Sequence, residues 1–163
     1  MPTQRYVIIK LLEQLKEGDE FSPENYPLHI TIVPSFQLEK LDDVLLGKIK
    51  QLCNNFKAFV LVAGEDEFFG PNREVHVTTM VMNDKLQELH DSLVSVLLDA
   101  GAIFDEPQYM LENYRAHATV QETVRLHEGD SIIVDRITVI DKLPNGLPTK
   151  RKLLKTLNFS DIK

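Results

Sequence analysis

Two short segments of the chain carry a histidine and a threonine in the same arrangement. The segment YPLHITIVPSF contains His29 and Thr31, and the much later segment YRAHATVQE contains His117 and Thr119. Side chains alternate between the two faces of a β-strand, so residues i and i+2 point in the same direction. Each segment, as a strand, therefore presents an imidazole and a hydroxyl side by side.

Two such pairs suit the cleavage of a phosphodiester. That reaction needs a base to take a proton from the attacking oxygen and an acid to give one to the leaving oxygen. Two histidines, each with an ordinary pKa near ~6.5, can fill both roles. Threonine hydroxyls are short and stiff and can donate to the non-bridging phosphate oxygens. This chemistry requires no metal ion.

The spacing of the motifs favours one copy in each half of the chain. His29 and His117 are 117 − 29 = 88 positions apart in a chain of 163 residues. A third copy, EVHVTTM, contains His76 and Thr78. It lies between a Gly-Pro-Asn turn and a predicted helix, whereas the other two follow proline-containing loops. We therefore predict a structural or peripheral role for His76.

Two further histidines lie outside these motifs. His90 is in the middle of a predicted helix, off its apolar stripe, and His127 is in a HEGD turn. Both are predicted to be exposed to solvent.

Apolar periodicity predicts the elements that position these residues. Strands are predicted at 5–12, 29–33 (ended by Pro34), 57–69, 74–82, 115–122, 131–143 and near 150–158, and helices over 38–56 and 84–100. The order of elements repeats roughly once along the chain. We expect an α+β fold of two pseudo-symmetric lobes, each a largely antiparallel sheet packed with a helix, with an active-site cleft between them.

The whole chain, 1–163, is expected to form a single bilobal domain. Lobe 1 covers roughly 1–70 and lobe 2 roughly 71–163, with the final strands free to cross back.

The composition is that of a globular protein, with 43% hydrophobic and 26% charged residues. The single cysteine, Cys53, lies in a helical apolar repeat and is predicted to be a buried thiol. A net charge of −7 argues against binding to long duplex nucleic acid. The chain has neither a membrane-length apolar run nor a signal-peptide pattern, so we expect a cytoplasmic protein and a monomer.

The segments PLHITIV and RAHATVQ resemble the paired His-x-Thr-x signatures of the 2H phosphoesterase superfamily. That superfamily includes bacterial RNA 2′,3′-cyclic phosphodiesterases, also called 2′-5′ RNA ligases. The resemblance covers most of the chain: EDEFFGPNREVHV is similar to the Phe-containing turn and strand that usually open the second lobe, which puts His76 at a non-motif position.

The resemblance implies a bilobal α+β fold with a central cleft and phosphodiester chemistry without metal or cofactor. It implies that His29 and His117 are the acid/base pair and that Thr31 and Thr119 hold the phosphate. Arg115 matches a basic residue often found two positions before the second motif histidine, and strand parity also turns it to the cleft, where it would steady the phosphate.

Three aromatic residues near the motifs, Tyr26, Phe36 and Tyr114, are candidates for stacking on a base. The alternative for each of them is packing within the protein.

Departures from the family pattern bear on the substrate. Ile32 and Val120 replace the commoner leucine, and Gln121 stands where some RNA-processing members carry a basic residue. Together with the acidic balance, this favours a small cyclic phosphate nucleotide or an RNA terminus as the ligand.

Other functions stay open at this point. One is a non-catalytic module that binds a nucleotide or RNA end in the same cleft. Another is a metal hydrolase using His29, His76 and His117, although no carboxylate falls at a ligand-like spacing in the motifs.

Overall fold

The computed structural model describes residues 4–160. Its strands are β1 (Gln4–Leu11), β2 (Glu20–Phe21), β3 (His29–Leu38), β4 (Phe59–Phe69), β5 (Val75–Met80), β6 (Ile103–Phe104), β7 (His117–Thr119), β8 (Ser131–Val134), β9 (Arg136–Asp141) and β10 (Arg151–Asn158). The helices are α1 (Asp43–Asn54) and α2 (Asp84–Asp99), with four single 3₁₀ turns, η1 (Pro23–Asn25), η2 (Pro107–Tyr109), η3 (Leu111–Asn113) and η4 (Pro144–Gly146).

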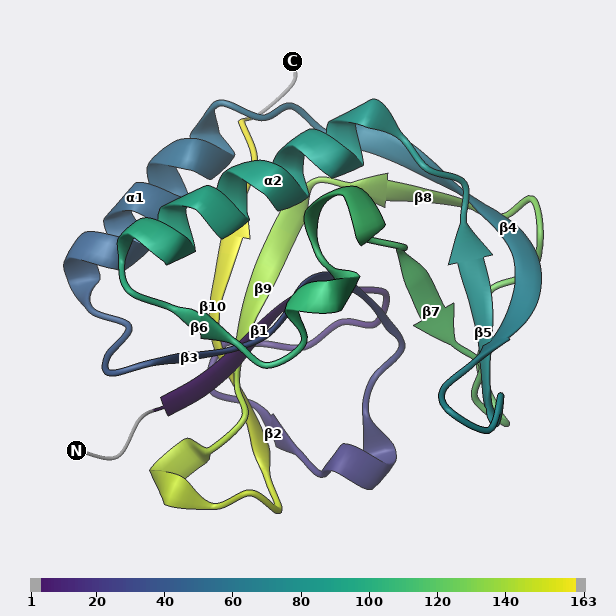
Figure 1. Cartoon of the computed structure of the whole chain (residues 1–163), viewed down its shortest axis with the longest axis horizontal. Helices are drawn as coiled ribbons and strands as arrows, with labels where there is room; N and C mark the ends of the chain where they lie inside the picture. The colour runs from purple at the N-terminus through teal and green to yellow at the C-terminus, as the bar shows by residue number, and fades with distance from the viewer. Residues whose placement is uncertain (1–3, 161–163) are drawn as a thin grey trace.

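The strands form two antiparallel sheets. The order is β2-β10-β9-β1-β3-β6 in the six-stranded sheet and β7-β5-β4-β8 in the four-stranded sheet. Figure 1 shows α1 and α2 side by side over one face of the six-stranded sheet, while the four-stranded sheet curves away at one end. The α+β architecture with antiparallel sheets is as predicted.

The chain passes back and forth between the two sheets. β4 lies before residue 70 but belongs to the four-stranded sheet, whereas β6, β9 and β10 return to the six-stranded sheet. β1 needs hydrogen-bond partners along both edges, and β9 supplies them along the edge that β3 leaves open. A boundary near residue 70 therefore does not separate the two sheets.

One hydrophobic core lies between the helices and both sheets. Ile8 and Ile30 enter it from the six-stranded sheet, Leu61 from the four-stranded sheet and Leu93 from α2. Cys53 is fully buried there, as predicted, and burial raises the pKa of its thiol to about 12. No helix within residues 4–160 is long and apolar enough to cross a membrane.

The opposite face of the six-stranded sheet carries a smaller apolar cluster. Val7, Ile9, Ile140 and Leu153 form it, and Leu11, Leu15, Phe21 and Tyr26 pack against it. The loop that contains η1 is thereby fixed against the sheet just before the first motif histidine.

β3 is longer than its sequence predicts. The strand was expected to end at Pro34, but it continues to Leu38, and α1 begins at Asp43 rather than near residue 38. Pairing with β1 is irregular on both sides of Val33, so Pro34 falls where the regular ladder is already interrupted. The side chain of Asp42 accepts a hydrogen bond from the Leu45 N–H and fixes the start of α1.

The same irregularity makes a β-bulge directly after the first motif. Ile9 lies opposite Thr31, but Ile8 lies opposite Val33, so Ile32 is an extra residue with no partner on β1. Bulges re-aim side chains and are frequent beside active sites.

Candidate active site

The two motif histidines are held in the same way. The Nδ1 atom of His29 lies 2.8 Å from the carbonyl oxygen of Pro27, and that of His117 lies 2.9 Å from the carbonyl oxygen of Arg115. In each case the acceptor is two residues before the histidine. Because a carbonyl oxygen only accepts, each Nδ1 carries a proton and donates it. Nε2 is then the atom that accepts a proton in the neutral ring and gives it up from the charged ring.

An aromatic ring packs against each of these imidazoles. The ring of Tyr26 lies 4.4 Å from that of His29, and the ring of Phe69 lies 4.8 Å from that of His117, between centroids. Burial lowers the pKa of both histidines, because the charged ring loses water. The positive charge of His117 also lowers the pKa of His29, and the positive charge of Arg115 lowers the pKa of His117. The backbone hydrogen bonds of the two imidazoles act in the opposite direction and raise their pKa values.

Contacts between distant segments bring the two motifs together. β3 and β7 are neighbours where the two sheets meet. The Tyr114 hydroxyl donates to the Thr31 carbonyl oxygen at 2.7 Å, and the Gln121 side chain donates to the Tyr26 carbonyl oxygen at 2.8 Å. The motif threonines are half-buried or exposed, and within residues 4–160 their hydroxyls have no hydrogen-bond partner. Two imidazoles and two hydroxyls are thus available in one region.

The third copy of the motif lies on the face of the four-stranded sheet opposite His117. His117 on β7 pairs with Thr79 on β5, so the side chains of these two residues share a face. His76 and Thr78 lie an odd number of residues from Thr79, which places both on the face opposite His117. The Nε2 atom of His76 lies 2.8 Å from a carboxylate oxygen of Asp66. This placement agrees with the structural role predicted for His76.

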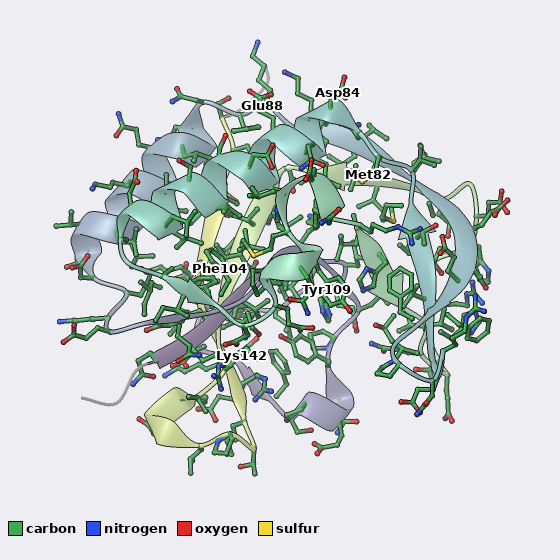
Figure 2. All side chains as sticks on the ribbon, in the orientation of Figure 1. Met82, Asp84, Glu88, Phe104, Tyr109 and Lys142 are labelled. Atoms are coloured by element: carbon green, nitrogen blue, oxygen red, sulfur yellow. The ribbon has the colours of Figure 1, made fainter. Side chains whose placement is uncertain are left out.

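The prediction that His90 is exposed is wrong. His90 is fully buried, with Nδ1 2.7 Å from the Ile32 carbonyl oxygen and Nε2 accepting from the Leu111 N–H at 2.9 Å. It lies four residues from Leu86 and from Val94, both buried, and so shares their side of α2. The exposed side of α2 carries Asp84 and Glu88, at the top of Figure 2. His127 is exposed, as predicted.

Arg115 lies beside His117 and already has an acidic partner. Its guanidinium is 2.6 Å from a carboxylate oxygen of Glu67 and 5.3 Å from the ring centroid of Phe69. Sequence analysis missed Glu67 and Phe69. Their i, i+2 spacing in a predicted strand was the available signal, since it turns both side chains to the face of β4 that meets Arg115.

Two residues proposed for base stacking are instead part of the core. Phe36 is fully buried against Tyr6 and Phe104, the latter labelled in Figure 2. Tyr114 is only 5% exposed and lies parallel to the His90 ring. Both side chains therefore pack within the protein, because residues from other elements cover them.

Tyr26 keeps a place at the site. It is half-buried against His29, and burial raises its pKa to about 12. Its hydroxyl therefore stays protonated at neutral pH.

The donor set of the metal-hydrolase alternative is not assembled. Within residues 4–160, no three His, Cys, Asp or Glu side chains gather in a group that could hold a metal ion. His76, which that alternative requires, lies on the opposite face of the sheet from His117.

Comparison with known proteins identifies similar sequences and folds. A family model described as the 2′-5′ RNA ligase superfamily matches residues 7–141. No curated protein matches the chain. A crystal structure of a phosphoesterase is 15% identical, with a TM-score of 0.59, and the match covers 98% of this chain and 100% of that one.

Two other solved structures are similar to the same degree. E. coli LigT complexed with 3′-AMP is 16% identical, with a TM-score of 0.58 and coverage of 98% of this chain and 100% of that one. The protein TT0787 of Thermus thermophilus is 12% identical, with a TM-score of 0.59 and the same coverage. At such identities the likeness shows the fold.

Proposed function

The chain belongs to the 2′-5′ RNA ligase superfamily, and we propose that it is a metal-independent phosphodiesterase that opens 2′,3′-cyclic phosphates of nucleotides or RNA ends. The observation that carries this proposal is the matched geometry of His29 and His117. In each motif a backbone carbonyl two residues before the histidine holds Nδ1 and leaves Nε2 for proton transfer. A site with two such imidazoles suits a reaction in which one proton is taken and another is given.

The chemistry follows from the two protonation states. One neutral imidazole takes a proton at Nε2 from a water molecule while the water oxygen bonds to phosphorus. The bond between phosphorus and the 3′ oxygen breaks, and the other imidazole, protonated, gives its Nε2 proton to that oxygen. The products are a 2′-phosphomonoester and a free 3′-hydroxyl, and the two histidines exchange protons with solvent to return to their starting states.

The remaining polar groups hold the phosphate. Thr31 and Thr119 stand two positions after the histidines on the same strand faces and donate to the non-bridging oxygens. Arg115 adds positive charge beside His117, with its guanidinium fixed by Glu67. These hydroxyls and the guanidinium stabilise the charge that builds up on phosphorus-bound oxygen during the reaction.

The size of the substrate is inferred from similar structures and from charge. Structures of E. coli LigT are described as complexes with 3′-AMP, ATP, NADP+ and phosphate. By analogy we propose a nucleotide-sized ligand for this chain. The net charge of −7 favours a mononucleotide or a strand terminus over a long duplex.

Hydrolysis of the four nucleoside 2′,3′-cyclic monophosphates in excess EDTA tests the proposal. We expect turnover that resists EDTA and yields the 2′-nucleotide, identified by chromatography. Turnover that EDTA abolishes would overturn the metal-independent mechanism. Nucleotide binding without turnover of any of the four would instead favour the non-catalytic binding module.

A further inference from the structure

A buried pair of rings joins the segments that carry the two motifs. His90 on α2 is fully buried, and Tyr114, three residues before His117, is 5% exposed. The rings are stacked with centroids 4.0 Å apart and planes within 2° of parallel. Neither ring touches the proposed reacting atoms, so their place in the chemistry needs another explanation.

Each polar side-chain atom of this pair has a backbone partner. His90 Nδ1 donates to the Ile32 carbonyl oxygen at 2.7 Å, and its Nε2 accepts from the Leu111 N–H at 2.9 Å. The Tyr114 hydroxyl donates to the Thr31 carbonyl oxygen at 2.7 Å. These contacts require the neutral His90 ring with its proton on Nδ1, because Nε2 must accept. Burial favours the same state, since it lowers the pKa of His90.

The two carbonyl groups belong to consecutive residues at the bulge in β3. Ile32 is the extra residue there, so the regular ladder with β1 is interrupted directly after Thr31. Buried carbonyl groups without partners destabilise a fold. His90 and Tyr114 supply these partners, and the same bonds attach the segment before β7 to the first motif.

We propose that His90 and Tyr114 are positioning residues that set the distance between the first motif pair and the second. The inference rests on the proposed function, in which groups from β3 and β7 act on one phosphate. Tyr114 is bonded to the backbone of Thr31 and lies close in sequence to His117, so it connects the two pairs directly. Displacement of a catalytic group by ~1 Å lowers the rate by up to about 100-fold.

Tyr114→Phe is the first test, because it removes one hydroxyl and keeps the ring stack. We expect kcat to fall about 10- to 100-fold with KM nearly unchanged. Tyr6→Phe is the matched control: Tyr6 is also 5% exposed and packs on Phe36, near the other end of β3. Equal kcat values for the two variants would overturn the proposal, as would a change confined to thermal stability.

Substitutions of His90 separate its two bonds. His90→Asn keeps a donor near the Nδ1 position, and His90→Gln keeps an acceptor near the Nε2 position, whereas His90→Leu removes both. We expect each polar variant to retain more kcat than His90→Leu. Equal kcat for all three would overturn the role of these bonds, and Tyr114→Phe still decides the proposal if the His90 variants do not fold.

A spectroscopic measurement separates this inference from the proposed function. In the NMR spectrum, the imidazole proton resonances of His29 and His117 report their surroundings without any substrate. We expect Tyr114→Phe to shift both sets of resonances and Tyr6→Phe to shift neither. A wild-type protein without phosphodiesterase activity would refute the proposed function. Unshifted resonances in Tyr114→Phe would refute the positioning role.

Discussion

Replacing the motif histidines by alanine is the most direct test of the proposed chemistry. His29→Ala and His117→Ala are each expected to lower kcat by about 10²- to 10⁴-fold, the usual contribution of a positioned acid or base. The two losses should be of similar size, because both imidazoles are held by the same kind of backbone bond, at 2.8 and 2.9 Å. The double variant should lose less than the product of the two, because acid and base act in the same transition state.

The other accessible histidines provide internal controls. His76 is bonded to Asp66 on the face of the sheet opposite His117, and His127 is in an exposed turn. Substituting either by alanine is expected to change kcat by no more than about two-fold, as for most surface positions. Comparing His117→Ala with His76→Ala therefore tests which face of the four-stranded sheet carries the chemistry.

The assay is the initial rate of 2′,3′-cyclic AMP hydrolysis in EDTA, with circular dichroism to check that each variant is folded. The reasoning is refuted if His76→Ala loses as much activity as His29→Ala. It is also refuted if either motif variant keeps a rate close to that of the wild type.

Four further predictions follow from the site and the core. Because burial lowers the pKa of both His29 and His117, and one ring must be charged while the other is neutral, kcat/KM should peak below about pH 6.5; a maximum above about pH 7.5 would contradict this. Thr31→Val, which replaces the hydroxyl by a methyl group, should lower kcat about 100-fold without unfolding the protein, and unchanged kinetics would remove Thr31 from the site. Burial also lowers the pKa of His90, so near about pH 6.5 the unfolded chain binds a proton that the folded chain does not bind. Above this pH the protonation of His90 should not change the free energy of unfolding. Below about pH 6.5 the free energy of unfolding should fall as the pH falls, by at most about 1.4 kcal/mol per pH unit. Urea unfolding at about pH 7.5 and pH 5.5 measures this, and His90→Gln should show a weaker pH dependence than the wild type. The Cys53 thiol should react with a disulfide reagent only after denaturation, because it is fully buried and burial raises its pKa to about 12; reaction in the native state would show that the core opens there.

The alternation of side chains along a strand predicted much of the candidate site from sequence. Placing His29 with Thr31, and His117 with Thr119, requires only the two-residue period. The same rule could not exclude His76, because all three copies have the same local pattern. The difference lies in the pairing of β5 with β7, where Thr79 rather than His76 lies opposite His117. Such pairing connects residues distant in sequence, so the alternation of side chains along one strand cannot reveal it.

Burial was the other property that sequence reasoning judged poorly. His90 reads as polar and exposed, yet the carbonyl and amide that satisfy it come from β3 and η3, outside its own helix. Phe36 lies in β3 and Tyr114 lies just before β7, and only the packed fold shows that both side chains are covered. The length of β3 was missed because the bulge that accommodates Pro34 depends on its pairing with β1.

The strand order of the six-stranded sheet has a consequence for folding during synthesis. β9 lies between β1 and β10, and β10 lies between β9 and β2. The ribosome delivers β1 first, so one edge of this strand stays unpaired until residues 136–141 have emerged. The edge of β9 that does not contact β1 then stays unpaired until residues 151–158 have emerged. Open strand edges can pair with other chains and cause aggregation. We therefore expect the nascent polypeptide to be most prone to such association while the segment between β3 and β10 is translated.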